Sequence, residues 1–173
     1  ERLPMLISEG TRDKLNDVLT HSFFLIMLCD NAVYQIDYSV YPMAAHIVHE
    51  SYAHYWPQVA DQWSDLMIKL NAKPVRGNLI ADYKDYNGNL AAIFADIAKA
   101  TEDYRRKVIE LIELAELNED KEVVLAGEDV LQQILPYRKQ ADIWAVEAKR
   151  YEGNYKSFDA RIKTFTTMIP IVG

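Results

Sequence analysis

Apolar side chains recur every three to four residues over four long stretches of this chain, a spacing that places them on one face of an α-helix. In the first stretch the repeat includes Leu15, Leu19, Phe23, Ile26 and Val33. The pattern predicts four long helices followed by a C-terminal extension. The expected ranges are about 10–36, 43–73, 89–117 and 120–152 for the helices, and 153–173 for the extension.

Prolines and glycines indicate where these helices begin, bend and end. Pro42 suits the first turn of the second helix, because an N–H at that position has no partner within the helix. Pro57 falls inside the same helix, where its missing N–H should interrupt the hydrogen-bond ladder and kink the helix. Gly153 is a natural end for the fourth helix.

The lengths of the connections between the helices limit the possible topologies of the bundle. The first and second helices are joined by a few residues, as are the third and fourth, so each pair should form an antiparallel hairpin. The segment 74–88 is longer and spans roughly 50 Å when extended. The second helix is about 45 Å long at its rise per residue. The predicted fold class is therefore all-α, a four-helix bundle with a long crossover between its second and third helices.

Composition supports a single domain over residues 1–173. The chain has 173 residues, of which 50% are hydrophobic, which is enough for a sizeable core. The single Cys29 excludes an internal disulfide framework and indicates a reducing compartment, so we expect a cytoplasmic location. The net charge of −7 argues against DNA binding by the bare surface, and the longest apolar run is too short for a membrane span.

The second predicted helix carries a stripe of metal-ligand side chains. His46, Glu50, Asp61 and Asp65 fall within about 100° of one another around its axis. Carboxylates and imidazoles together favour iron or another transition metal. The first two residues, however, lie about 22 Å along the axis from the two aspartates. One chain cannot bring both pairs to one ion, whereas two antiparallel copies related by a two-fold axis can.

The remaining histidines divide between the stripe and other faces. His54 lies on the stripe and is a weaker ligand candidate, or a donor that orients a carboxylate. A regular helix directs His49 away from the stripe, so we expect a surface or packing role for it. His21 stands alone on the first helix and is expected to be structural. The alternative to a metal site is a stripe that forms a solvated or hydrogen-bonded polar interface.

The stretch that begins at His46, HIVHESYAHYWPQVADQWSDLMIKLNAKP, resembles the second helix of the Dps proteins, the DNA-protection-during-starvation branch of the ferritin superfamily. In that family a histidine is followed by a carboxylate four residues on, Asp fifteen on, Glu nineteen on, and then a helix-ending Lys-Pro. Those places here hold His46, Glu50, Asp61, Asp65, Lys73 and Pro74. The resemblance extends in hydrophobic pattern over about residues 10–150 and implies a ferritin-like fold.

The resemblance also implies a function. Dps proteins form homo-oligomeric shells, usually dodecamers, that oxidise Fe(II) with peroxide at sites between two subunits and store the ferric mineral as protection against oxidative stress. Three residues depart from the family pattern. Tyr34 stands where the family has a histidine twelve residues before His46, Asp65 replaces a glutamate, and Pro57 interrupts the stripe. Tyr34 is a weaker ligand candidate, because a neutral phenol binds Fe(II) poorly.

Other functions stay open beside iron oxidation. The same fold without iron chemistry would be a structural or interaction protein, and a site that binds Zn²⁺ or another divalent ion without turnover lies between the two. Di-iron bundle enzymes need Glu-x-x-His on two helices, and no Glu of this chain has a His three residues on. Direct DNA binding is not expected, because the segment before the first helix is mixed in charge and the C-terminal extension has few cations.

Overall fold

The computed structural model describes residues 3–79 and 84–172, and within them the regular secondary structure is entirely helical. The bundle contains α1 (Glu9–Tyr38), a second helix that is divided into segments, α4 (Leu90–Leu117) and α5 (Lys121–Arg150). The divided helix comprises α2 (Pro42–Ile47), a π-helical turn (Val48–Tyr52), a 3-10 turn (Ala53–Tyr55) and α3 (Trp56–Lys69). A shorter helix, α6 (Tyr155–Phe165), follows α5.

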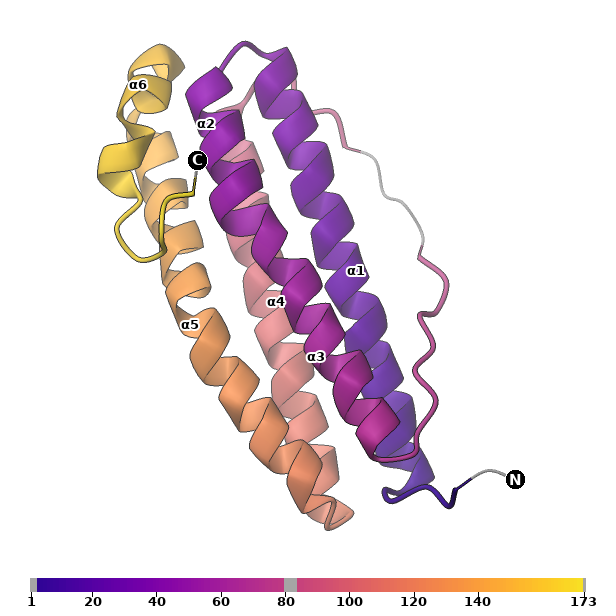
Figure 1. Cartoon of the computed structure of the whole chain (residues 1–173). Helices are drawn as coiled ribbons and strands as arrows, with labels where there is room; N and C mark the ends of the chain where they lie inside the picture. The colour runs from indigo at the N-terminus through magenta and orange to yellow at the C-terminus, as the bar shows by residue number, and fades with distance from the viewer. Residues whose placement is uncertain (1–2, 80–83, 173) are drawn as a thin grey trace.

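The helices form two antiparallel hairpins joined by a long crossover (Figure 1). In the first hairpin α1 packs against α2 and α3, in the second α4 packs against α5, and α1 also lies against α4. α4 begins at the same end of the bundle as α2. The predicted bundle with a long crossover between its second and third helices is therefore confirmed. In the described part of the chain, every helix falls short of the continuous apolar length that a membrane crossing requires.

Side chains of α1 hold the crossover in place. The N–H of Val75 donates to Asn16 Oδ1 at 2.8 Å. Nearer to α4, the side-chain amide of Gln35 donates to the carbonyl of Lys84 at 2.6 Å and accepts from the N–H of Tyr86 at 2.8 Å. An extended segment cannot pair these backbone groups with itself. The amides of α1 therefore set the position of both described parts of the crossover.

A buried carboxylate organises one end of the bundle. Asp120, the residue before α5, is only 7% exposed. Its Oδ2 accepts hydrogen bonds from the hydroxyls of Ser8 at 2.9 Å and Thr11 at 2.5 Å. Ser8 is also the N-cap of α1, where its side chain accepts from the N–H of Thr11. One carboxylate thus ties the beginning of α1 to the beginning of α5.

Aromatic side chains fill the middle of the bundle. Trp56, Trp63 and Trp144 are buried. Tyr104 reaches across from α4, where its hydroxyl accepts from Trp63 Nε1 at 2.8 Å and bonds the Ser22 hydroxyl at 2.7 Å. Burial raises the pKa of Tyr104 to about 12, so this hydroxyl stays neutral. Buried polar groups require partners, and these bonds supply them for Trp63, Tyr104 and Ser22 while joining α1, α3 and α4.

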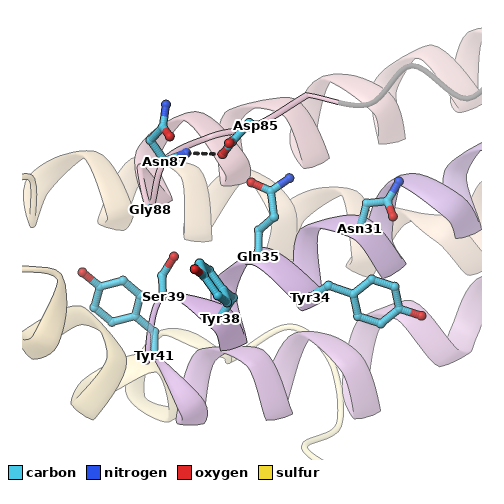
Figure 2. A pocket seen from close by; sticks show the side chains of 9 residues that line it. All are labelled: Asn31, Tyr34, Gln35, Tyr38, Ser39, Tyr41, Asp85, Asn87 and Gly88. Carbon is cyan, nitrogen blue, oxygen red and sulfur yellow. Dashed lines mark hydrogen bonds between the residues drawn. The ribbon is translucent and has the colours of Figure 1, made fainter.

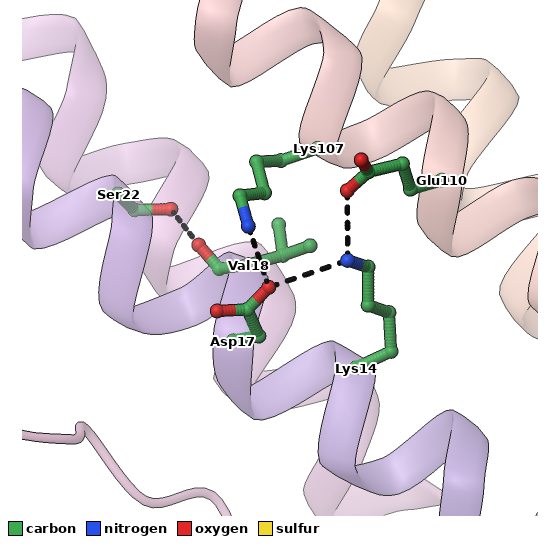
Figure 3. Close-up of polar contacts among 6 residues, drawn as sticks. All are labelled: Lys14, Asp17, Val18, Ser22, Lys107 and Glu110. Atoms are coloured by element: carbon green, nitrogen blue, oxygen red, sulfur yellow. Dashed lines mark hydrogen bonds and ion pairs between the residues drawn. The ribbon is translucent and has the colours of Figure 1, made fainter.

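On the surface, ion pairs connect α1 with α4 (Figure 3). Lys107 Nζ lies 3.1 Å from Asp17 Oδ2, and Lys14 Nζ lies 3.3 Å from the same oxygen and 2.8 Å from Glu110. Burial alone would raise the pKa of Asp17, but the two ammonium groups outweigh it and the pKa is lowered. Exposed pairs of this kind contribute little to stability individually, so the buried apolar side chains of α1 and α4 dominate the contact between the two helices.

Replacing Asp120 with Ala should lower the free energy of unfolding by about 2 kcal/mol, because two hydroxyls lose their acceptor in a buried environment. Urea denaturation followed by circular dichroism measures the change. Asp13→Asn is the matched control: this carboxylate is exposed and pairs with the neighbouring Arg12, so its loss should leave stability nearly unchanged. Equal stability of D120A and the unmodified protein would show that the carboxylate does not hold the two helix ends together.

Asp17→Asn should destabilise the protein by no more than about 0.5 kcal/mol at neutral pH, since water screens these exposed ion pairs. The folded pKa of Asp17 lies below the unfolded value of about 3.9. Its contribution is therefore complete above that value and is lost as the pH falls through the folded pKa. Urea titrations carried from neutral into strongly acid solution should show the difference shrinking. A difference that persists in strong acid would rule out charge as its cause.

Candidate metal centre

The second bundle helix changes its hydrogen-bond register just before Pro57. Proline has no N–H, so the carbonyl four residues earlier cannot receive a bond from it. Pro57 occupies the first turn of α3, where no such bond is needed. The 3-10 turn and the π turn precede it. In the π turn the N–H of Ala53 bonds to the carbonyl of Val48, five residues earlier, which adds one residue to that turn of the helix.

The wider turn brings side chains that are five residues apart onto one face. The Nε2 atoms of His49 and His54 lie 3.0 Å apart, with ring centroids separated by 4.4 Å. Glu50 lies beside both rings: its Oε1 is 3.6 Å from His49 Nδ1 and its Oε2 is 3.3 Å from His54 Nδ1. Each of the three residues offers one ligand atom, and these atoms lie within 4.8 Å of one another. This π-turn cluster of His49, Glu50 and His54 has the donor types and spacing of a metal site.

The π-turn cluster lies at the surface, where an ion can reach it from solvent. The side chains of His49 and His54 are 46% and 53% exposed, and that of Glu50 is 31% exposed. The helix α1 contributes a further carboxylate, Asp30. Burial raises the pKa of Asp30, and the imidazoles of His49 and His54 act against that rise, so all three groups lie within electrostatic reach.

The four ligands predicted from the sequence are spread along the second helix. His46 is exposed on α2, Glu50 belongs to the π-turn cluster, and Asp61 and Asp65 are exposed on α3. Asp65 lines a shallow groove between α3 and α5. Of these four residues, Glu50 is the one that belongs to a group of three possible metal ligands within the described part of the chain. A shared site for all four stays a prediction, because its two halves would come from two copies of the chain.

The structure changes the interpretation of two histidines. His54, a weaker candidate from the sequence, lies inside the π-turn cluster. The prediction that His49 points away from the stripe is wrong, because His49 contacts both His54 and Glu50. That prediction used the rotation of a regular α-helix, whereas the π turn adds a residue between the two histidines. Pro57 signalled an interruption of the helix, but no residue pattern specified a π turn.

Tyr34 takes part in a different feature of the surface. Its side chain is 66% exposed and lines a hollow of about 810 Å³ between the end of α1 and the turn before α4 (Figure 2). Figure 2 shows Tyr34 and Tyr41 pointing in opposite directions. Among the described residues that line the hollow, Asp85 is the one with a charged side chain. Tyr34 as an iron ligand remains a prediction.

The interior of the bundle holds few acidic groups. Among the described residues, the buried polar and charged side chains are Thr11, Ser22, Ser51, Thr101, Asp120, Gln140 and Thr166. The one carboxylate in this set, Asp120, lies at the end of the bundle and is bonded to α1. Di-iron bundle proteins place several carboxylates between facing helices. In the described residues, the candidate metal chemistry therefore lies on the outer face instead.

Comparisons with known proteins agree with this architecture. The sequence matches no family model and no curated protein. A PmFTN variant whose crystal was soaked overnight in iron has a TM-score of 0.77 at 14% identity, over 88% of this chain and 99% of the PmFTN chain. An open-pore ferritin from the hyperthermophilic archaeon Archaeoglobus fulgidus has a TM-score of 0.79 at 13% identity, over 92% of this chain and 97% of that one. The chain therefore has the ferritin-like helical-bundle fold.

Proposed function

We propose that the chain is a Dps-like subunit of a homo-oligomer that binds and oxidises Fe(II) and stores the product. The position of Glu50 carries the proposal: this carboxylate lies beside imidazoles on an exposed face of the second helix of a ferritin-like bundle. The solved structures similar in fold include ferritin crystals soaked in iron. That similarity supports iron as the substrate.

The proposed iron site is shared between two copies of the chain. His46 and Glu50 come from one copy, and Asp61 and Asp65 from the other, because about 22 Å separates the two pairs along a single helix. An antiparallel contact between second helices across a two-fold axis places each pair opposite its complement. His46, Asp61 and Asp65 are exposed in the single chain and Glu50 is partly exposed. All four are therefore accessible to such a contact.

The donor set suits the oxidation of iron. Carboxylate oxygens hold Fe(II) and tolerate Fe(III), and an imidazole completes a coordination sphere that leaves positions for the oxidant. With peroxide, two Fe(II) ions give up one electron each and one H₂O₂ accepts both. With two further water molecules the products are two FeOOH units and four protons. A closed shell, of twelve subunits in the Dps family, would enclose this mineral.

A second function shares the fold but not the oxidation. Tyr34 stands where the Dps pattern has a histidine, and its side chain lies largely exposed beside the hollow. A neutral phenol at this place weakens the site for Fe(II). The observation favours an oligomeric structural or interaction protein, or one that holds another divalent ion without turnover. Such a protein would form the same two-fold contact without oxidising iron.

Glu50→Gln and Asp61→Asn should each slow Fe(II) oxidation at least about tenfold, because each replacement removes a charged ligand while keeping the side chain's shape. The measurement is the rise in near-ultraviolet absorbance after Fe(II) and peroxide are added to the purified protein. Glu113→Gln, which alters an exposed carboxylate on α4, is the matched control. Unaltered kinetics in D61N would reject the assigned site, and no catalysed oxidation by the natural sequence would favour the second function.

Two inactive variants should restore activity to each other if the site is shared. In a mixed dimer of E50Q and D61N, one site combines the intact Glu50 of one copy with the intact Asp61 of the other. Random mixing after unfolding and refolding together should therefore recover about a quarter of the full activity. Each variant refolded alone is the control. A mixture no more active than its components would place all the ligands within one chain and contradict the two-copy site.

A further inference from the structure

We propose that the π-turn cluster is a second metal site, complete within one chain, for a late first-row divalent ion such as Zn²⁺ or Co²⁺, and that an ion bound there withholds Glu50 from the iron site. The first half of this proposal stands on the geometry of His49, Glu50 and His54 alone. The second half rests on the proposed function, because it requires an iron site that uses Glu50.

The donor set of the cluster selects this class of ion. Two imidazoles and one carboxylate are a ligand set that holds Zn²⁺ with a fourth position open to water. At Zn–N distances of about 2.0–2.1 Å, two nitrogens of a tetrahedral site lie about 3.4 Å apart. The Nε2 atoms of His49 and His54 are separated by 3.0 Å. Small side-chain rotations are therefore enough to admit an ion between them.

The backbone beneath the cluster is held by the rest of the fold. Val48, Ser51 and Tyr52, which belong to the same π turn, are buried. The N–H of Val172, in the C-terminal segment, donates a hydrogen bond to Ser51 Oγ at 3.0 Å and so connects this segment to the π turn. Ligands that already face one another on a fixed backbone lose little freedom when an ion binds. π-helical turns inside α-helices frequently mark functional sites, and here the turn itself creates the spacing of the two imidazoles.

Glu50 connects the two sites. One of its carboxylate oxygens faces His49 at 3.6 Å and the other faces His54 at 3.3 Å. An ion held by the two imidazoles takes at least one of these oxygens, and its positive charge keeps the carboxylate at the cluster. The shared iron site then lacks one of its acidic ligands. Zn²⁺ should therefore inhibit iron oxidation while leaving the aspartates of α3 unoccupied.

Titration of the full chain with Co²⁺, in the absence of iron, tests the first half of the proposal. We expect one Co²⁺ per chain with the visible absorption of a four-coordinate ion. His54→Gln should weaken binding at least about tenfold, whereas Glu113→Gln should bind like the natural sequence. The replaced side chains are exposed, and circular dichroism checks that each variant retains its helices.

His46→Gln separates the two sites, since this residue belongs to the proposed iron site and lies outside the π-turn cluster. Retained Co²⁺ binding in His46→Gln together with its loss in His54→Gln supports a site within one chain. Loss of Co²⁺ binding in His46→Gln overturns the assignment. Binding that survives in the double variant of His49→Gln and His54→Gln overturns it as well.

Iron oxidation measured with and without one equivalent of Zn²⁺ tests the second half. Zn²⁺ should slow iron oxidation by the unmodified protein several-fold. In His49→Gln, the ratio of the oxidation rates without and with Zn²⁺ should approach one. Equal inhibition of both proteins overturns the sharing of Glu50. If the natural sequence oxidises no iron even without zinc, the proposed function and the sharing of Glu50 fail together. The Co²⁺ titration still decides whether the π-turn cluster binds a metal.

Discussion

The directions of the metal-ligand side chains on the second helix depend on the missing N–H of Pro57, because it interrupts the hydrogen bonds of the helix. A regular ladder cannot continue through this residue, so α3 begins at Trp56, and a 3-10 turn and a π turn lie between it and α2. An added residue rotates everything before it by about 100° relative to everything after it. His49 consequently meets His54 instead of pointing away from it. Val48 and Tyr52, which belong to the irregular turn, are fully buried.

The aromatic core determines which side of the helices remains free for function. Trp56, Trp63 and Tyr104 pack across the middle of the bundle, and a bond from Trp63 to Tyr104 satisfies two of their polar atoms. A group of carboxylates in the same space would require desolvation of several charges at once. On the outer face of the second helix, acidic and imidazole side chains keep contact with water and avoid this desolvation. A metal ion on this face would take its ligands either from one region of a single chain or from two copies of the chain.

In our proposals Glu50 belongs to two groups of ligands with different chemical preferences. With the imidazoles of the π-turn cluster it forms a nitrogen-rich set, which favours late divalent ions. With the aspartates of a neighbouring copy it would form an oxygen-rich set, which suits iron in both oxidation states. The two sets would compete for one carboxylate. In the proposed assembly, this competition would make the rate of iron oxidation depend on the metal bound at the π-turn cluster.

Several features of the fold follow from the sequence alone. The helical repeat and the length of the crossover predicted the bundle and the connection between α3 and α4, because both signals are summed over many residues. Pro57 predicted an interruption of the second helix, since a proline removes a backbone donor in any tertiary context. The sequence also predicted Glu50 as a candidate metal ligand, and the structure places it beside His49 and His54.

The tertiary structure decided the direction of single side chains. His49 meets His54 because a π turn spans residues 48–52. Asp30 of α1 interacts electrostatically with the same rings, a relation between helices that no spacing within one helix can show. One extra residue in a turn leaves the hydrophobic repeat of a long helix recognisable. The same residue changes which side chains face one another, and therefore which atoms can bind one metal ion. The sequence therefore determined the bundle, and packing decided which ligands meet.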